Sequence, residues 1–328
     1  NTNLVNLALK ESKHAFKIDS LLIPVSVTLG MIYSGTGKYD EAIVEFRRAL
    51  KIEPNHAQAN RELAKTYELM GKENEAEKIF KRAIQIKPNY WAGYNDLGVH
   101  YYKNGNYDDA IEQFKMVIKL TPDNYRGYNN LGGIYYMLEK WGDARDMFEK
   151  SLEIKKSYNI YSNLGTLYFI EKNYEDAALT YEEALKLNDK NYLTWGNLAA
   201  AYSEVPAKKS KALETYKQAI KIAEEQVKIN PKDPDLISNL ASYYADIGDE
   251  DKSLNLLKKS LLIAPENVQV IFRAATIYEK LGNRDQSLHW IEDAIKKGYS
   301  QSDIENQPEL KELIADARYK VLVKQDND

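Results

Sequence analysis

The chain has 328 residues and a formal net charge of −4, with 45 basic and 49 acidic residues and no cysteine. Without cysteine there can be no disulfide and no thiolate metal site, and the evenly mixed charge lacks the basic block that nucleic-acid binding requires. Because no run reaches the roughly 20 apolar residues that span a bilayer and no signal peptide is visible, we expect a cytoplasmic chain that binds neither nucleic acid nor membranes.

Residues 1–22 precede a regular pattern that starts at residue 23. Ala8 and Ala15 lie 34 residues before Ala42 and Ala49, which belong to the second helix of the first complete repeat. We interpret this segment as the second helix of a truncated repeat, followed by a linker. Its first helix would lie upstream of the first residue, so we expect the chain to be a fragment of a longer protein.

Tyrosine then recurs at a nearly constant interval. The recurring residues are Tyr33, Tyr67, Tyr101, Tyr135, Tyr168, Tyr202, Tyr244 and Tyr278, and the gaps between them are 34, 34, 34, 33, 34, 42 and 34 residues. A period near 34 predicts stacked copies of one small repeat in place of a single folded centre. Such arrays bury each repeat against its neighbours and mostly offer a long surface to a partner.

Helical spacing defines the repeat. Leu29 and Tyr33 are four apart and share one helix face, and Ala42 and Phe46 share a face of a second helix. A polar turn separates the helices, and Pro54 ends the second. Small residues on both helices let the backbones approach closely, while larger apolar side chains fill the space beside them. The same offsets predict eight repeats, at 23–56, 57–90, 91–124, 125–157, 158–191, 192–233, 234–267 and 268–300.

The sixth repeat is longer than the others. Ala219 and Pro231 are 12 residues apart, whereas the corresponding Ala49 and Pro54 are five apart. Seven extra residues correspond to about two helical turns, so we predict a second helix of roughly 209–229. The extra length is either a tolerated insertion or a lip that shapes the binding groove or contacts another domain.

The motif spacing resembles that of the tetratricopeptide repeat family. Trp195, Leu198, Ala199 and Tyr202 follow the family pattern W-x2-L-G-x2-Y with alanine for glycine, and the later A-x3-F recurs in most repeats. The resemblance implies an all-α fold, namely a right-handed α-solenoid, or superhelix, of tetratricopeptide helix pairs. It also implies a scaffold that binds other proteins.

Residues 301–328 follow the last repeat and predict short helices that cap its hydrophobic face. The tail 294–322 and the segment 90–98 resemble the tetratricopeptide arrays of bacterial multidomain signalling proteins. In those proteins the array follows a serine/threonine kinase, TolB-like, winged-helix or cyclase domain. The resemblance therefore implies that the chain is part of a bacterial signalling protein.

The residue types that carry catalysis lack the spacing that catalysis needs. None of the four histidines, His14, His56, His100 and His289, has a partner at metal-ligand spacing, and we interpret His100 as a packed core residue. No glycine-rich phosphate loop and no G-x-S-x-G motif occur. The carboxylates are expected on exposed helix faces, without a shared cleft for acid–base catalysis. We therefore assign no enzymatic activity, no metal and no cofactor.

In this family the first helices line the concave side, so their inward residues are candidates for binding. The residue before the core leucine is asparagine in repeats four to seven: Asn130, Asn163, Asn197 and Asn239. Because an amide both donates and accepts, we predict a ladder for an extended peptide backbone, similar to that of O-linked N-acetylglucosamine transferase arrays. The alternative is that asparagine is only typical of the family at this position. The other candidates are Asn95, Asp96, Tyr102, Arg126, Asn129, Tyr136, Met137, Phe169 and Arg273.

The leading hypothesis is a non-catalytic module that binds a protein or an extended peptide in its concave groove. Two alternatives are a regulatory array that clasps its own upstream domain and a self-assembly scaffold, so we expect a monomer or a weak dimer. A two-carboxylate clamp is another binding mode of this family, for which Arg61, Lys65, Arg126 and Asn130 come closest. We reject it because Asp96 stands where the clamp needs asparagine and would repel a carboxylate.

Overall fold

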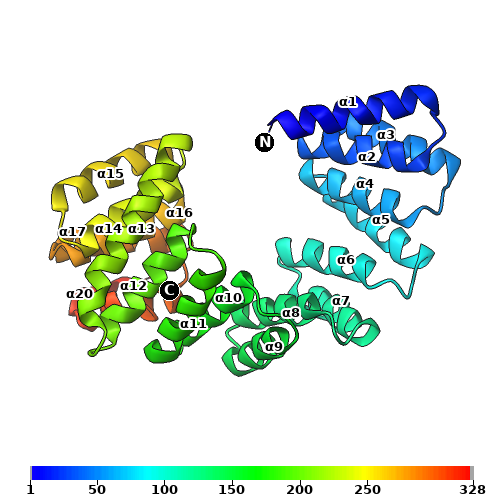
Figure 1. Cartoon of the computed structure of the whole chain (residues 1–328). Helices are drawn as coiled ribbons and strands as arrows, with labels where there is room; N and C mark the ends of the chain where they lie inside the picture. The colour runs from blue at the N-terminus through cyan, green and yellow to red at the C-terminus, as the bar shows by residue number, and fades with distance from the viewer. Residues whose placement is uncertain (1, 326–328) are drawn as a thin grey trace. The chain divides into compact units, whose positions relative to one another are not determined.

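The computed structural model describes residues 2–325, and these residues form α-helices, one short 3-10 helix and connecting turns, without a strand. The chain divides into two compact units, Asn1–Lys155 (unit 1) and Lys156–Asp328 (unit 2). Within each unit the helices stack in adjacent pairs (Figure 1). The predicted all-α solenoid of helix pairs is confirmed, while the boundaries of the eight repeats stay a prediction.

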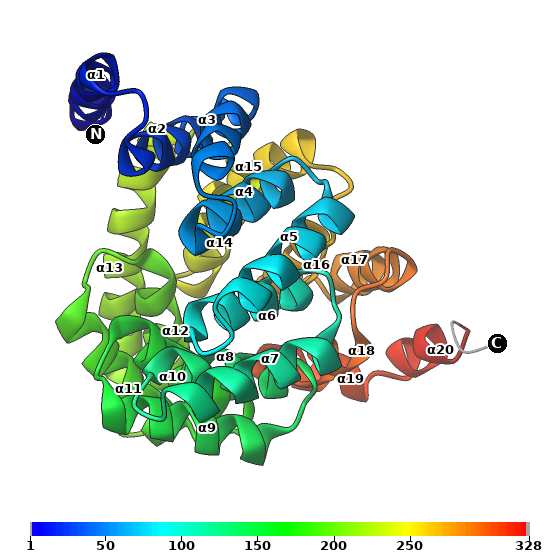
Figure 2. The same cartoon turned by 90° about the vertical axis from the view of Figure 1, so that its right-hand side faces the viewer.

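Unit 1 consists of α1 followed by four helix pairs. Its helices are α1 (Thr2–Ile18), α2 (Ile23–Gly35), α3 (Tyr39–Ile52), α4 (Ala57–Leu69), α5 (Glu73–Ile86), α6 (Trp91–Lys103), α7 (Tyr107–Leu120), α8 (Tyr125–Met137) and α9 (Trp141–Ile154). The first helix of each pair packs against the second, and each second helix packs against the first helix of the following pair. Figure 2 shows α2 to α7 from a second direction.

Unit 2 continues the pattern and ends in shorter helices. Its helices are α10 (Tyr158–Ile170), α11 (Tyr174–Leu187), α12 (Tyr192–Glu204), α13 (Lys209–Ile229), α14 (Pro234–Asp246), α15 (Glu250–Ile263), α16 (Val268–Lys280), α17 (Arg284–Lys296), α18 (Gln301–Glu305), the 3-10 helix η1 (Pro308–Leu310), α19 (Lys311–Ala315) and α20 (Ala317–Gln325). Among the described residues, no helix combines the length and the apolar character needed to cross a bilayer.

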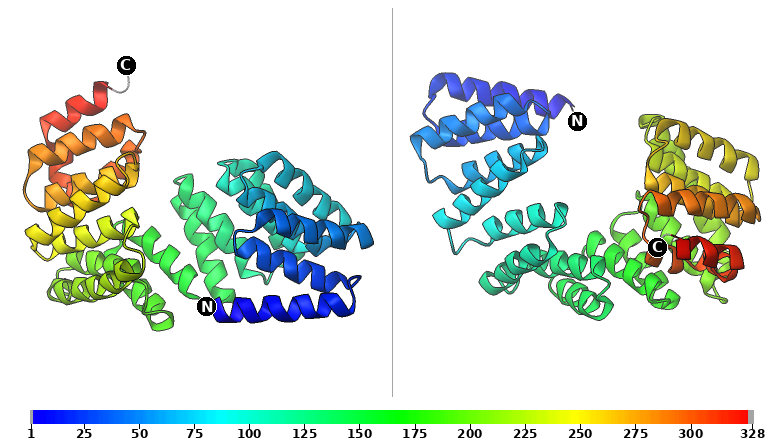
Figure 3. Two further views of the ribbon diagram at one scale, coloured as in Figure 1. Left: turned by 90° about the horizontal axis from the view of Figure 1, so that it is seen from above. Right: turned by 180° about the vertical axis from the view of Figure 1, so that it is seen from behind.

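Helix α1 lies beside α2 at the edge of unit 1 (Figure 3). Its Ala8 is exposed, whereas Ala42, at the corresponding position of α3, is fully buried. The difference arises because α3 is covered by its own first helix α2, while no helix of the described chain covers α1 in that way.

A small residue facing a ring sets the distance between the helices of a pair. A Cβ atom added to Gly132 of α8 would lie 2.8 Å from the Phe148 ring of α9, and one added to Gly165 of α10 would lie 2.8 Å from the Tyr181 ring of α11. Both rings are at most 2% exposed. Full burial of such a ring stabilises the pair by roughly 1.5–3 kcal/mol, which explains why the sequence alternates small and large residues at these positions.

The recurring tyrosines also bond to the pair before them. The hydroxyl of Tyr202 on α12 donates to Glu182 Oε1 on α11 at 2.7 Å, and that of Tyr244 on α14 donates to Glu224 Oε1 on α13 at 2.6 Å. Burial, and next the hydrogen bond to the carboxylate, raises the pKa of both tyrosines above the ordinary value. Each ring therefore fills the core while its hydroxyl ties one pair to the next.

Helix α13 covers Lys209–Ile229, the range predicted from the long sixth repeat. The extra turns continue as helix because Ala223 is fully buried and Val227 packs in the same cluster. Near the end of α13, Gln226 Nε2 donates to the carbonyl oxygen of Lys190 at 3.3 Å. This contact fixes the added length against the segment that precedes α12.

The tail caps the last pair of unit 2, as predicted. Ile304, Leu310 and Leu313 are fully buried, and Tyr319 is 2% exposed, in one cluster with residues of α16 and α17. Arg318 Nη1 adds a bond to Asp285 Oδ1 of α17 at 2.6 Å. Positions 326–328 of the predicted cap lie outside the described residues.

Left-handed residues end the first helices, and two of them are not glycine. Gly37, Gly71 and Gly105 have φ of 76°, 70° and 75° in the turns that join the helices of a pair. The corresponding positions in the fourth and fifth repeats are Glu139, with φ 56°, and Lys172, with φ 61°. A residue with a Cβ atom in this conformation costs roughly 1–2 kcal/mol.

We expect Glu139→Gly to raise the free energy of unfolding by about 1 kcal/mol, because glycine removes the left-handed strain at a turn that already has this conformation. Urea unfolding followed by circular dichroism measures the change. Glu112→Gly, in the middle of α7, is the control and should lower stability by about 1 kcal/mol. Equal effects of the two substitutions would contradict the argument.

We expect Asp316→Asn to reduce stability at neutral pH but not near pH 2. Side-chain hydrogen bonds from Arg318 are the main cause that lowers the pKa of Asp316 from 3.8 to about 2. A lowered carboxyl pKa means that the stabilisation is present above the ordinary pKa and is lost as pH falls through the folded value. Unfolding midpoints of both proteins between pH 7 and pH 2 test this, and a pH-independent difference would refute it.

Candidate peptide-binding surface

All twelve predicted site residues lie on first helices, and they fall into two sets. Unit 1 holds Asn95, Asp96 and Tyr102 on α6 and Arg126, Asn129, Asn130 and Tyr136 on α8. Unit 2 holds Asn163 and Phe169 on α10, Asn197 on α12, Asn239 on α14 and Arg273 on α16. We describe the two sets separately.

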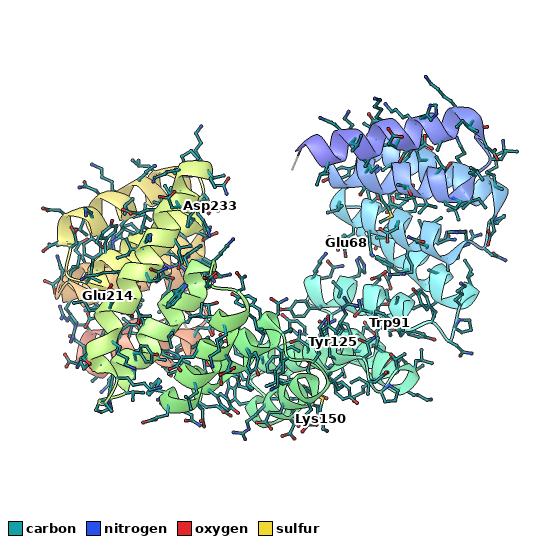
Figure 4. All side chains as sticks on the ribbon, viewed as in Figure 1. Glu68, Trp91, Tyr125, Lys150, Glu214 and Asp233 are labelled. Carbon is teal, nitrogen blue, oxygen red and sulfur yellow. The ribbon has the colours of Figure 1, made fainter. Side chains whose placement is uncertain are left out.

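Neighbouring first helices contact one another within unit 1: α4 touches α6, and α6 touches α8. Their outward faces therefore form one surface, which we call the first-helix surface of unit 1 and define as the faces of α4, α6 and α8 that carry Arg61, Asp96 and Asn130. Figure 4 shows the side chains of these helices, with Glu68 labelled on α4 and Trp91 and Tyr125 at the starts of α6 and α8.

An amide pair links the two predicted helices of this surface. Asn130 Nδ2 donates to Asn95 Oδ1 at 3.1 Å, and both side chains belong to half-buried residues. The bond uses one of the two N–H groups of Asn130 and leaves its oxygen available. The amide is therefore held in one orientation by its neighbour.

Asp96 neutralises two cations of α4. Arg61 Nε lies 2.6 Å and Lys65 Nζ 3.3 Å from Asp96 Oδ2, and the side chains of Arg61 and Asp96 are only 13% and 9% exposed. The sequence led us to reject a carboxylate clamp because Asp96 would repel the ligand. The ion pairs add a second reason, since the two cations already have a carboxylate partner.

Aromatic rings at the ends of three first helices pack on rings five residues later. The pairs are Tyr102–Tyr107, Tyr136–Trp141 and Phe169–Tyr174, with centroids 6.0, 5.5 and 5.2 Å apart. Burial is the main cause that raises the pKa of Tyr102. The sequence analysis proposed the first member of each pair and missed the second, although an aromatic residue at the fifth following position was a readable signal. The pairs hold the candidate anchors in fixed positions.

Arg126 is exposed and lies over two rings that the sequence analysis did not include. Its guanidinium carbon is 5.9 Å from the Trp91 ring centroid and 5.4 Å from the Tyr125 centroid. Lys155 Nζ lies 4.6 Å from the centroid of the same Tyr125 ring. Each such contact contributes roughly 0.5–1 kcal/mol at an exposed site. Arg126 is thereby held with the edges of its guanidinium open.

The asparagines of unit 2 differ in their surroundings. Asn239 Nδ2 donates to the carbonyl oxygen of Asp235 at 2.8 Å, and its side chain also hydrogen-bonds Tyr192, which counters the rise that burial causes in the tyrosine pKa. Asn163 and Asn197 are half-buried on α10 and α12. The side chain of Asn197 has no hydrogen-bond partner among the described residues. It is the ladder residue best placed to bond a ligand.

Two further ionic contacts join α14 to α16. Arg273 Nη1 donates to Ser238 Oγ at 2.8 Å, and burial lowers the pKa of this guanidinium. Lys280 Nζ lies 2.9 Å from Asp246 Oδ1, and burial raises the pKa of Asp246 while the ammonium opposes the rise. Arg273 thus bonds to a neighbouring first helix, and the Lys280–Asp246 pair was missed although the two residues are 34 apart.

His100 is a packed core residue, as its position indicated. It is 2% exposed, its ring lies 5.5 Å from the Phe80 ring, and its Nδ1 is 3.0 Å from Glu68 Oε1. Across residues 2–325, no group of three or more histidine, cysteine, aspartate and glutamate side chains is arranged to hold a metal ion.

Comparison with family models decides the class of the chain. Models described as tetratricopeptide repeat match residues 35–98, 127–158, 158–191 and 234–267, and one described as TPR repeat matches residues 100–139. The chain belongs to the tetratricopeptide repeat family. Its repeats indicate a protein-interaction module. No curated protein matches the sequence.

Solved structures share the fold at low identity. The APC/C hetero-tetramer Cut9-Hcn1 is 19% identical, with 80% of this chain and 50% of that chain covered and a TM-score of 0.60. The chain thus spans about half the length of that match. Pseudomonas aeruginosa pilF is 21% identical over 64% of this chain and 92% of that chain, with a TM-score of 0.53. The C-terminal part of a TPR repeat-containing protein from Cytophaga hutchinsonii is 19% identical over 74% and 97%, with a TM-score of 0.51.

We expect Asp96→Asn to lower the free energy of unfolding by about 1.5–3 kcal/mol, because two cations lose their charged partner in a largely buried setting. Inorganic phosphate should raise the melting temperature of this variant more than that of the wild type, since Arg61 and Lys65 then bind an external anion. Asp123→Asn, in an exposed turn, is the control and should change neither quantity. A variant as stable as the wild type and indifferent to phosphate would contradict the expectation.

Proposed function

We propose that the chain is a non-catalytic module that binds an extended peptide segment of a partner protein across its first helices. The observation that carries the proposal is the arrangement on α6 and α8, where an amide pair, Asn130 with Asn95, lies among rings held by neighbouring rings. Rigid aromatic groups bind with little loss of side-chain entropy. Amides bond to any peptide backbone, whatever its sequence.

Hydrogen bonds alone do not supply useful affinity. Each contributes roughly 0.5–1.5 kcal/mol, so four amides correspond to about millimolar binding. Side-chain contacts with Tyr102, Tyr136 and Arg126 must therefore provide most of the free energy of binding in unit 1. In unit 2 the amides of Asn163, Asn197 and Asn239, together with Phe169, take that part. The proposal assigns no catalysis to these residues, and a turnover traced to this chain alone would contradict that assignment.

We further propose that the module serves a bacterial signalling protein, as the resemblance of 90–98 and 294–322 implies. Its partner is then either a separate protein or an effector domain of the same protein. A gene that joins these residues to a kinase, TolB-like, winged-helix or cyclase domain supports this context. A gene that encodes no such domain counts against it.

Asn197→Ala should weaken the binding of a peptide that contacts unit 2 by about 3–10-fold, the loss expected for one hydrogen bond. Peptides are selected on the wild-type chain from a random 12-residue display library, and their affinities are measured by fluorescence anisotropy. Asn255→Ala, which removes an exposed asparagine from the second helix α15, is the matched control. Failure to select any peptide contradicts the proposed function, and equal affinities for both variants contradict the role of Asn197.

A further inference from the structure

Gly133 lies within α8, and helix packing gives no reason for a glycine there. A Cβ atom added to Gly133 meets no heavy atom within 4 Å, whereas one added to its neighbour Gly132 would lie 2.8 Å from the Phe148 ring. Gly133 is not among the glycines with positive φ, so its backbone does not require glycine either. Because glycine inside a helix is less stable than alanine, position 133 lowers the stability of α8 without a benefit to the fold.

The same face of α8 carries groups that suit a ligand. Asn130 and Met137 lie three and four residues from Gly133, and Arg126 lies seven residues before it, so all three share one side of the helix. Arg126 and Met137 are exposed, and Asn130 is held by Asn95. Gly133 therefore interrupts a row of larger side chains and leaves the helix backbone accessible.

Arg126 gives this face an uncompensated positive charge. Its guanidinium lies over the Trp91 and Tyr125 rings and has no ion-pair partner within residues 2–325. Arg61, two first helices earlier, differs because Asp96 neutralises it. The charge at Arg126 is complementary to a carboxylate, and the guanidinium fork can bond a carboxylate with two parallel hydrogen bonds.

We propose that an extended acidic peptide crosses α8 at Gly133, with its main chain against the glycine backbone and one aspartate or glutamate side chain at Arg126. The missing Cβ atom lets the two backbones approach closely. Arg126 and Gly133 are separated by about 10 Å along the helix, which an extended chain covers in about three residues. The inference rests on the proposed function and names the charge of the partner and the position of its main chain.

Gly133→Ala tests the crossing point because it separates stability from binding. The substitution should raise the melting temperature of the chain by about 2–4 °C and weaken the selected acidic peptides at least tenfold. Gly142→Ala, on the second helix α9, also adds a Cβ atom in open space. This control should leave peptide affinity within twofold of the wild type. A Gly133→Ala protein that is less stable, or that binds as the wild type does, overturns the inference.

Arg126→Gln tests the charge of the partner. Peptides selected on the wild type from the random 12-residue library should be enriched in aspartate and glutamate and should bind Arg126→Gln about tenfold more weakly. Replacing the acidic residue of the peptide by its amide should abolish the difference between the two proteins. Lys150→Gln, an exposed cation on α9 (Figure 4), is the matched control and should bind as the wild type does.

The outcomes separate the inference from the proposed function. Binding peptides without enrichment in acidic residues, or equal losses in the Arg126→Gln and Lys150→Gln proteins, overturn the inference while peptide binding itself stands. A library that yields no binding peptide overturns both.

Discussion

The contact between a small residue on each first helix and a large residue on its second helix is the constraint on which the rest of the structure depends. Gly132 against Phe148 is typical: no side chain fits on the glycine, and the ring is almost completely buried. The contact fixes how closely the two helices pack, and the tyrosine three residues after the small position then reaches the preceding pair. Because every pair repeats this geometry, the first helices emerge in register and present equivalent positions to a ligand.

The sequence was sufficient for the fold because its information is local and periodic. Tyrosines at a fixed interval and apolar residues four apart determine helix, face and repeat, and even the length of α13 followed from seven added residues. The binding surface was only partly predictable. Helical spacing shows which face Asp96 and Asn130 occupy, but it does not show that Asp96 pairs with Arg61. Those partners lie on different repeats, and several polar neighbours compete for each group.

The two units present different chemistry on equivalent positions. In unit 1 the first helices carry charges and rings, such as Asp96 and Arg126, and in unit 2 they carry mainly amides and hydroxyls, such as Asn197 and Ser238. The charged groups of α14 and α16 in unit 2, Lys280 and Asp246, are paired with each other. Charge discrimination therefore belongs to unit 1, whereas unit 2 suits sequence-independent contact with a peptide backbone.

One position shows how the array separates structure from recognition. The first helix of the fourth repeat is joined to its second helix by a ring pair, Tyr136 with Trp141, and that of the eighth repeat by an ion pair, Glu279 with Arg284. Both arrangements join residues five apart across the same turn, so the backbone geometry does not depend on either chemistry. Residues used in such internal contacts are constrained by the fold. Specificity for a partner must then reside mainly in groups that the fold leaves without a hydrogen-bond partner, and among the predicted residues Arg126 and Asn197 meet that condition within the described chain.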